Sequence, residues 1–264
     1  MIAEQFIKDG SPNEALKTLQ AEIRKNPANP KLRIFLFQLL AVLGEWERAF
    51  TQLNLTGDLD AATLPMVQTY REAIRCEILR KEIFSGQKMP LFFGEPEQWI
   101  ALLVESLKLT AQQQYADAES LRDQAFELAP VTAGTINGKA FEWLSDADGR
   151  LGPILEAIVN GQYYWIPFSQ IQSIAIDEPI DLRDVVWTPA QFTWTNGGEA
   201  VGLIPTRYPQ SEIAEDPLLQ LARKTEWKEL FENTFVGLGQ RLLSSNDEDY
   251  ALMDIREIKF NPVN

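Results

Sequence analysis

The acidic side chains are the residues of this sequence best suited to chemistry. A glycosidase-type hydrolase needs two carboxyl groups, one that donates a proton and one that acts as nucleophile or base. The C-terminal half offers Glu142, Asp146, Asp177, Glu178, Asp181 and Asp184. Their spacing in the sequence does not place any two of them at the required separation. We interpret them as a solvated acidic face and keep a carboxylate-dependent hydrolase in the C-terminal domain as the alternative function.

Two short motifs resemble ion-binding loops without completing them. Asp146 and Asp148 match the opening of a calcium loop, but the twelfth position, which needs a glutamate, is Ala157. Gly237 and Gly239 resemble part of a phosphate-binding loop that lacks its third glycine and its lysine. We therefore predict no metal site. We expect capping and ion-pair roles for the aspartates, and a bulge or a close backbone approach at the glycines.

The chain contains no histidine and a single cysteine, Cys76. Without histidine, the Ser-His-Asp and Cys-His schemes and histidine metal ligation are excluded. A reactive thiolate needs a basic partner, so we interpret Cys76 as a packing residue of a helix. One cysteine cannot form an internal disulfide, which is typical of a cytosolic protein. The sequence predicts no catalytic residue and no cofactor.

The net charge of −14 limits the partners that the protein can bind. Nucleic acid and anionic membranes attract proteins through lysine and arginine, so both are disfavoured. The N-terminus lacks the basic segment and apolar run of a signal peptide. The most apolar stretch, residues 32–43, is far shorter than the roughly 20 residues of a membrane helix. We predict a soluble, cytoplasmic protein.

The elements that position these side chains begin with an internal repeat. The residues that recur 34 positions later are Gly10 as Gly44, Ala15 as Ala49 and Leu19 as Leu53. This is the period of tetratricopeptide-type helix hairpins. We expect small residues such as the two alanines where the helices of a pair approach closely. The repeat predicts a short helix before residue 10, followed by helices at 11–25, 30–43 and 46–53.

A longer helix at 64–84 and a third helix pair follow these repeats. The third pair follows a Gly- and Pro-rich loop at 85–95. The residues that match the repeat there are Leu102, Ser106, Leu109, Tyr115, Ala118, Ala125 and Pro130, and the step from Ala118 to Pro130 equals that from Ala15 to Pro27. Neighbouring pairs of this kind stack into a curved array whose concave side holds a peptide or helix. We predict that residues 1–130 form a tetratricopeptide-like α-superhelix of about three helix pairs, with an open trough.

The predicted trough has five candidate partner-binding residues, which are Arg33, Phe37, Gln38, Arg71 and Arg75. Two of them depart from the repeat pattern. Arg33 replaces the usual large aromatic residue and Phe37 the usual small one. Such residues either change the packing or face outward into the trough. The alternative is that the arginines form a solvated face and Phe37 is buried.

Beyond Pro130 the helix formers give way to Thr, Gly and Asn, and then to runs of β-branched and aromatic residues. Asn196-Gly197 between two such runs predicts a β-hairpin. We predict short helices at 151–160 and 216–223, and strands at 163–168, 171–176, 191–195, 199–204, 234–243 and 250–260. Residues 131–264 are therefore expected to form a β-rich α+β domain, either a curled antiparallel sheet or a partial barrel. The predicted fold class is multidomain α+β.

Several segments of this second half resemble the ImpE/TagJ family. They are FEWLSDADGRLGP at 141–153, EAIVNG at 156–161, WIPF at 165–168, DLRDVVWTPA at 181–190, NGG at 196–198 and GLGQR at 237–241. The segments occur in the order of the family and are not of low complexity. Together with the repeats, the resemblance covers nearly the whole chain.

Members of this family are accessory proteins of bacterial type VI secretion systems. The resemblance implies a cytoplasmic, non-enzymatic adaptor that binds a helix of the small sheath subunit. It also implies a link to the ClpV ATPase, which dismantles the contracted sheath, and no catalytic residues. We hypothesise that the helical array holds an amphipathic sheath helix, while the β-rich domain supports the array or presents a second surface. A second alternative function is a chaperone of another secretion route, which would differ from this adaptor only in the partner that it binds. The sequence leaves the oligomeric state open.

Overall fold

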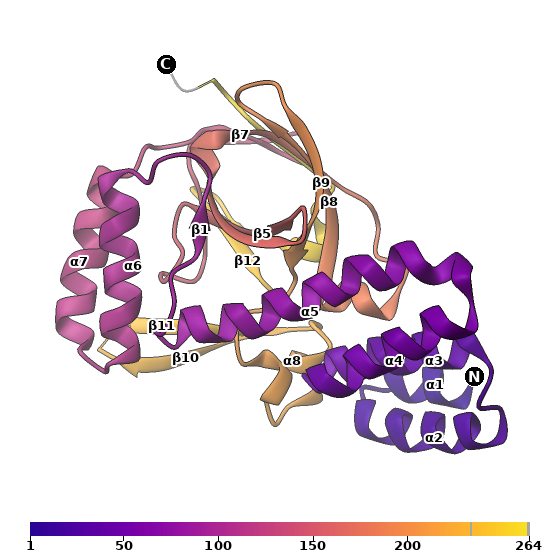
Figure 1. Cartoon of the computed structure of the whole chain (residues 1–264). Helices are drawn as coiled ribbons and strands as arrows, with labels where there is room; N and C mark the ends of the chain where they lie inside the picture. The colour runs from indigo at the N-terminus through magenta and orange to yellow at the C-terminus, as the bar shows by residue number, and fades with distance from the viewer. Residues whose placement is uncertain (233, 263–264) are drawn as a thin grey trace.

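The structure is a computed structural model that describes residues 1–232 and 234–262. Its first half is helical and its second half is rich in β-strands (Figure 1). The helices of the first half are α1 (Ile2–Lys8), α2 (Pro12–Lys25), α3 (Pro30–Val42), α4 (Trp46–Leu59), α5 (Leu64–Phe84), α6 (Gln98–Ala111) and α7 (Tyr115–Leu128). Every helix predicted for this half is present, and α4 extends six residues beyond its predicted end at Leu53.

The predicted repeat is confirmed by the turns inside the first two helix hairpins. Gly10 ends the α1 hairpin turn with φ +76°, and Gly44 does the same after α3 with φ +69°. A positive φ favours glycine because a Cβ atom is strained there. The repeated alanines, Ala15 and Ala49, are fully buried where the helices of each pair pack. In the third hairpin Gln113, with φ +64°, occupies the place of the glycine.

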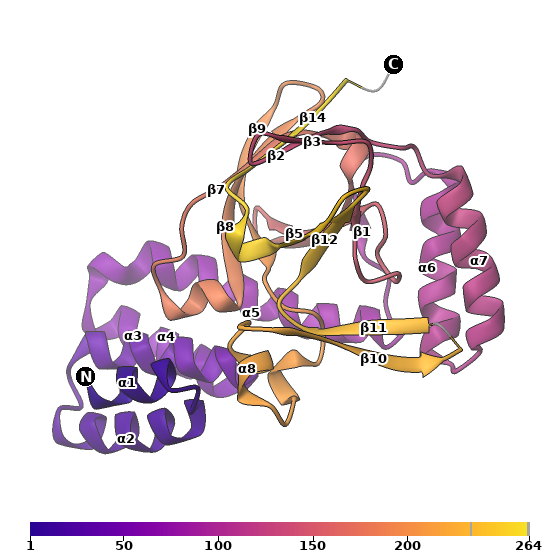
Figure 2. The ribbon, with the colours of Figure 1, turned by 180° about the vertical axis from the view of Figure 1, so that it is seen from behind.

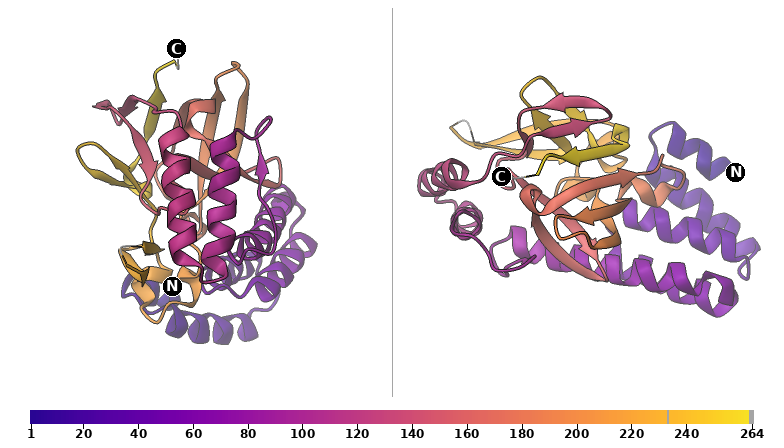
Figure 3. Two further views of the ribbon diagram at one scale, coloured as in Figure 1. Left: turned by 90° about the vertical axis from the view of Figure 1, so that its left-hand side faces the viewer. Right: turned by 90° about the horizontal axis from the view of Figure 1, so that it is seen from above.

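The third helix pair is set apart from the first two. Figures 1 and 2 show α6 and α7 beside the sheet, at the end of α5 that lies away from α1–α4, and Figure 3 shows the pair face-on. Between α5 and α6 the chain passes along the sheet, where β1 (Leu91–Phe92) pairs in parallel with a strand of the second half. The segment 85–95, which we predict to be a loop, thus contributes a short edge strand.

The β-rich half forms one large curled sheet and two small ones (Figures 1 and 3). The strands are β2 (Gly134–Ile136), β3 (Lys139–Phe141), β4 (Leu144–Asp146), β5 (Ile154–Val159), β6 (Gln162–Pro167), β7 (Ile171–Ile176), β8 (Trp187–Trp194), β9 (Glu199–Pro205), β10 (Thr225–Phe231), β11 (Thr234–Gly239), β12 (Leu242–Ser245), β13 (Asp249–Ala251) and β14 (Glu257–Phe260). The order in the large sheet is β1-β6-β5-β9-β8-β7-β14-β2-β3, and the small sheets are β13-β12-β4 and β10-β11. Apart from β1, neighbours are antiparallel, as predicted.

The predicted β-hairpin is formed by β8 and β9, which are joined at Asn196-Gly197. The predicted helix at 216–223 is present as the short α8 (Pro217–Gln220). The predicted strands at 234–243 and 250–260 are each interrupted: the first divides into β11 and β12, and the second into β13, the 3-10 turn η5 (Leu252–Asp254) and β14.

The helix predicted at 151–160 is wrong, because this segment is the central strand β5. Ile154 and Ile158 face the helices, while Leu155, Ala157 and Val159 face the interior of the curled sheet. A strand that is buried on both faces is apolar almost throughout, so the spacing of its apolar residues also fits a helix. Its end at Asn160-Gly161, with φ of +50° and +75°, is a hairpin turn and not a helix cap.

The two halves share one hydrophobic core. Tyr70 of α5 lies 5.5 Å from Trp187 of β8 between ring centroids, and Trp46 of α4 lies 6.0 Å from the same tryptophan. The 3-10 turn η3 (Leu182–Val185) packs onto the same core through its apolar side chains. The inner face of the first helices is therefore covered by the chain's own C-terminal half. The open trough predicted along that face is not present.

Two arginines of the C-terminal half cap helices of the repeats. Arg223 donates hydrogen bonds to the carbonyl oxygens of Ile7 and Lys8 at 2.7 and 2.8 Å, at the end of α1. Arg207 donates in the same way to Val42 at 2.7 Å, at the end of α3. The last carbonyls of a helix lack partners within the helix, and a positive charge there is favourable. Equivalent ends of the two repeats are thus attached to the β-rich half.

Candidate partner-binding groove

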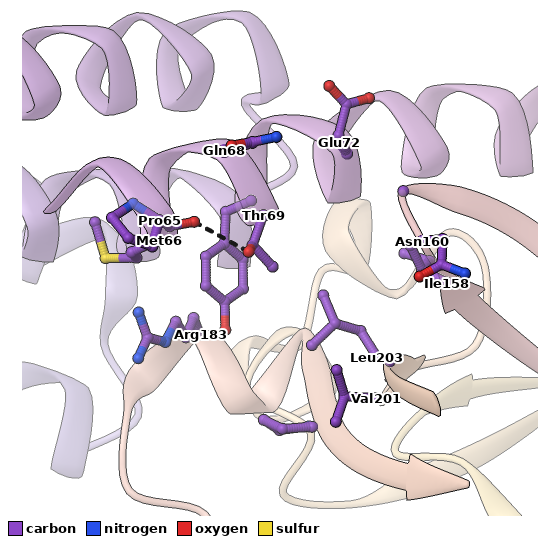
Figure 4. A pocket seen from close by; sticks show the side chains of 14 residues that line it. Pro65, Met66, Gln68, Thr69, Glu72, Ile158, Asn160, Arg183, Val201 and Leu203 are labelled. Carbon is purple, nitrogen blue, oxygen red and sulfur yellow. Dashed lines mark hydrogen bonds between the residues drawn. The ribbon is translucent and has the colours of Figure 1, made fainter. Parts of the chain in front are cut away.

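A groove lies between α5 and the large sheet (Figure 4). Its volume is about 690 Å³. It is lined by Pro65, Met66, Gln68, Thr69, Tyr70 and Glu72 of α5, Ile158 of β5, Asn160 and Gly161 of the β5–β6 turn, Arg183 of η3, Pro189 of β8, and Val201, Gly202 and Leu203 of β9. Seven of the twelve side chains in this lining are apolar or aromatic and five are polar or charged, a mixture that is typical of a binding site.

The groove exists because β9 separates from β5. These strands pair only at Ile158 with Leu203 and at Val159 with Gly202, since β5 ends there in its hairpin turn. The N-terminal part of β9 continues beyond the turn and presents Val201, which is 74% exposed. Helix α5 crosses above this gap, and Figure 4 shows Val201 and Leu203 facing the helix across it. An exposed valine is thereby placed on the wall of a concave surface.

The polar margin of the groove contains one positive and one negative side chain. The Arg183 guanidinium lies 4.8 Å from the centroid of the Tyr70 ring and forms an ion pair of 2.5 Å with Asp181. Burial raises the pKa of Tyr70 to about 12, so its hydroxyl remains protonated. On the opposite side, Glu72 of α5 forms an ion pair of 2.6 Å with Arg75. A ligand with apolar side chains and a few charged ones matches this lining.

A buried ion cluster joins α5 to the sheets next to this region. We define it as Arg80, Asp146, Glu156, Tyr163 and Arg241, all of them buried. Arg80 donates to Glu156 at 2.5 and 2.9 Å, Arg241 pairs with both carboxylates, and Tyr163 donates to Glu156. Each charge therefore has a partner of opposite sign, as burial requires.

Burial and charge act differently on the two carboxyl groups of the cluster. Burial raises the pKa of Glu156, but the charges of Arg80 and Arg241 outweigh it and lower the pKa to about 2. For Asp146 burial prevails over the attraction of Arg241, and the pKa rises to about 6. Both carboxyl groups are occupied by structural partners. The arrangement holds α5 and the strands of the β-rich half together.

Comparison with known proteins shows what this chain is related to. The family model described as ImpE protein matches residues 138–259. The chain is 48% identical over 262 residues to the type VI secretion system accessory component TagJ of Pseudomonas aeruginosa, covering 99% of this chain and 92% of that protein. The chain belongs to the ImpE/TagJ family. It thereby shares its family with an accessory component of type VI secretion.

A solved structure of the same fold supports this relationship. The crystal structure of protein VPA1032 from Vibrio parahaemolyticus superposes with a TM-score of 0.90 and 25% sequence identity. The alignment covers 99% of this chain and 98% of that one. The combination of helical repeats and a β-rich half is therefore shared along the whole length of both proteins.

Three of the five residues predicted to bind a partner lie at the surface of this ImpE/TagJ protein. The guanidinium groups of Arg71 and Arg75 lie 5.1 and 5.9 Å from the Phe50 ring centroid, on the α4–α5 face beside the groove. Arg33 is half-buried and donates to the carbonyl of Pro27 and, at 2.9 Å, to Gln52. Its contacts tie the α2–α3 turn to α4.

The other two residues, Phe37 and Gln38, are 0% and 5% exposed. Phe37 packs on Tyr70 with ring centroids 5.6 Å apart. Neither side chain reaches a surface, so neither is placed to contact a partner, and for Phe37 the alternative of a buried side chain is what the structure shows. The reason is that Tyr70 of α5 covers Phe37 and itself packs on Trp187 of β8, in the core that the two halves share. The contact between Tyr70 and Trp187 spans more than a hundred residues of sequence and has no local signal.

The carboxylates considered for hydrolysis do not form a pair in the groove. Asp146 belongs to the ion cluster, and buried Asp184 accepts hydrogen bonds from the backbone N–H groups of Ile180 and Asp181. Glu142, Asp177 and Glu178 are exposed, and none of the six lines the groove. Within residues 1–232 and 234–262, no group of three or more metal-ligating side chains is placed to hold an ion. No helix in the same ranges is long and apolar enough to cross a bilayer.

The remaining motifs have structural roles. Asp148 pairs with Arg150 at 2.5 Å, as the ion-pair interpretation predicts, but a strand and not a helix follows it. A Cβ atom on Gly237 would lie 2.3 Å from the Tyr208 ring, which confirms the predicted close approach. Cys76 is buried in α5, and burial raises the pKa of its thiol to about 12. It packs as predicted.

Proposed function

We propose that this protein is a non-enzymatic, cytoplasmic adaptor of a type VI secretion system that binds an amphipathic helix of the small sheath subunit. The groove between α5 and the sheet is the proposed binding site. The observation that carries the proposal is the groove itself, which has a volume of about 690 Å³ and apolar side chains in its lining. The alternative position along the inner face of the repeats is already filled by the chain itself.

An amphipathic helix fits the groove by its chemistry. Such helices insert apolar side chains spaced at i, i+3, i+4 and i+7 into an apolar groove and keep charged residues at the rim. Met66, Ile158 and Leu203 form the apolar floor and walls. Outside the lining itself, Arg71 and Arg75 lie on the same helix, α5, with Arg75 paired to the groove residue Glu72. We call these two arginines the rim, and we expect acidic residues of the bound helix to face them.

The proposal includes a second task, assistance in recruiting the ClpV ATPase to the sheath. It is supported by the family relationship to a type VI accessory component. The groove uses only α5, η3 and one side of the sheet, which leaves the rest of the β-rich half free for a second partner. Because the two halves share a core, the partner assignments have to be tested in the full-length chain.

The test compares two valines in binding assays with the sheath helix. Val201 lines the groove and Val131 lies outside it, and each is 74% exposed. Val201→Glu introduces a charge into the apolar lining, so we expect at least a tenfold loss of affinity for a labelled peptide of the sheath helix, measured by fluorescence anisotropy. Val131→Glu makes the same chemical change outside the groove and should leave affinity unchanged.

The arginine rim is tested in the same assay. Replacing Arg71 and Arg75 with glutamate should weaken helix binding without lowering the melting temperature, since both side chains are at the surface. Equal affinities for the wild type and Val201→Glu would refute the groove as the binding site. A separate experiment measures the recruitment of ClpV to assembled sheath with and without the protein. Equal recruitment in both cases would refute the proposed assistance to ClpV but not the binding of the sheath helix.

A further inference from the structure

Strand β10 has an open edge. It pairs with β11 alone, in a two-stranded sheet at the margin of the molecule below the main sheet (Figure 2). The register joins Thr225 to Gly239, Trp227 to Gly237 and Glu229 to Phe235. The other edge of β11 is covered, because Gly237 donates its N–H to Asp148 and Gly239 donates to Ser211. β10 has no such cover in the described part of the chain.

The direction of the backbone groups follows from those two hydrogen bonds. Gly237 and Gly239 direct their N–H groups away from β10. In an antiparallel pair, residues opposite each other direct their backbone groups alike, both inward or both outward. Trp227 and Thr225 therefore direct their N–H and C=O groups away from β11. Glu229, two residues further along, does the same.

This outward row is a template for another strand. Among residues 1–232 and 234–262, no backbone hydrogen bond outside the strand pairing involves Thr225, Trp227 or Glu229. Proteins usually cover or shorten such edges, because they pair readily with other chains. The Trp227 side chain on this strand is 40% exposed. The register shifts between Glu229 and Phe231, so the regular run is 225–229, with Trp227 at its centre.

We propose that a second copy of this chain pairs with this edge, β10 against β10 in antiparallel orientation about a two-fold axis at Trp227. In this register Glu226 lies opposite Lys228 of the partner copy, and the symmetry forms this pair twice. The two Trp227 backbones exchange N–H···O=C hydrogen bonds in both directions. Opposite charges and aromatic residues facing each other across strands are both favourable pairs.

Strand length and charge select this register from its neighbours. An axis two residues earlier, at Thr225, would place residues 221–224, which precede the strand, opposite residues 226–229. An axis one residue later places Lys228 opposite its own copy, and an axis two residues later places Glu229 opposite its own copy. Like charges directly opposite each other are destabilising. Within the described residues Lys228 forms no ion pair, whereas Glu226 shares Lys224 with Asp216. The Lys228 ammonium is thus free to pair across the axis.

The experiment is a charge swap followed by analytical ultracentrifugation of the full-length protein. The wild type is expected to sediment as a concentration-dependent dimer. Glu226→Lys and Lys228→Glu each turn both cross-axis pairs into like-charge pairs, so each should weaken dimerisation about tenfold or more. The double variant, with both changes, restores opposite charges and should recover the wild-type dimer. Lys31→Glu, an equal change at an exposed lysine of α3, serves as the control and should not alter the dimer.

Circular dichroism of each variant separates loss of dimer from loss of fold. A wild type that stays monomeric at several hundred micromolar would overturn the proposal. In that case a second copy of the chain does not pair with the β10 edge, and any strand that pairs with it belongs to another protein. Failure of the double variant to recover would also overturn it, since the swap keeps every opposite-charge pair of the proposed register. The sheath-helix assay is independent of this result, because the groove and β10 share no residue.

Discussion

The helix hairpins and the seam between the two halves are stabilised by different kinds of contact. Within the hairpins, small and aliphatic residues such as Ala15, Leu19 and Leu53 are fully buried and contact residues close in sequence. At the seam, the buried residues include Arg80 and Arg207, whose partners lie in the other half of the chain. The hairpins are therefore locally specified, whereas the seam depends on a few long-range polar contacts.

Helix α5 shows this difference within one element. Its exposed side carries Arg75, paired with Glu72 in solvent, while its buried side carries Arg80, held by Glu156. Surface ion pairs contribute little to stability, but removing one member of a buried pair leaves an uncompensated charge in the interior. The same residue type thus joins the two halves on one face, and on the other lies at the surface where we propose that a partner binds.

The largest expected effect comes from breaking the buried ion cluster. Arg241→Met removes the guanidinium that pairs with both Asp146 and Glu156. Loss of one partner from a buried ion pair costs about 3–5 kcal/mol, so we expect a fall of that order in the free energy of unfolding, measured by urea denaturation.

Arg75→Met is the matched control, since it removes an exposed arginine by the same substitution. It should change the unfolding free energy by less than about 1 kcal/mol. Similar losses for the two variants would mean that the buried ion cluster, in which Glu156 also holds Arg80 of α5, does not depend on its charges, and the contrast between buried and exposed arginines would no longer hold.

A smaller effect is expected from pH, and it belongs to Asp146. Its pKa is about 6 in the folded protein, above the value of 3.8 that an unperturbed aspartate has. The folded state therefore binds this proton more tightly than the unfolded state does. The stabilising contribution is present below pH 4 and is lost as the pH rises through 6.

Asp146→Asn removes this titration. The unfolding free energy of the wild type, relative to the variant, should therefore decrease by about 1 kcal/mol between pH 5 and pH 7. Urea denaturation of both proteins at pH 5, 6 and 7 measures this difference. A difference that stays constant or grows with pH would show that Arg241 keeps Asp146 ionised throughout. Glu156, whose pKa is lowered to about 2, titrates below this window.

The sequence predicted well those elements whose signals are local. The 34-residue repeat located Gly10 and Gly44 at equivalent turns, and Asn196-Gly197 located a hairpin. The same Asn-Gly signal at 160–161 was present but was interpreted as a helix end, because β5 is apolar on both faces. A hairpin interpretation of 160–161 would have given the β5–β6 turn at the edge of the groove.

The candidate site was predictable only in part. Arg71 and Arg75 lie at the surface of one helix, and their helical spacing placed them together. For Phe37 the sequence could not decide between burial and exposure, because Phe37 packs on Tyr70 in a core that is completed by Trp187 of the second half. Val201 and Arg183 were missed for the same reason, since the groove is formed only when β9 passes beneath α5. Periodicity describes which face of a helix is apolar, but not which distant segment covers it.

The smallest expected effect concerns the one hairpin turn that lacks glycine. Gln113 holds φ +64° in the α6–α7 turn, where the other hairpins have Gly10 and Gly44. A left-handed conformation costs a non-glycine residue of the order of 1 kcal/mol, partly offset by the greater freedom that glycine has in the unfolded chain. Gln113→Gly should therefore stabilise the protein by roughly 0.5 kcal/mol in thermal or urea unfolding. Gly44→Ala is the opposite change, and should destabilise by more than this, because its Cβ would also lie 2.5 Å from Cγ of Glu212. If Gln113→Gly is neutral or destabilising, the Gln113 side chain stabilises its turn by contacts of its own, and the third hairpin does not follow the rule of the first two.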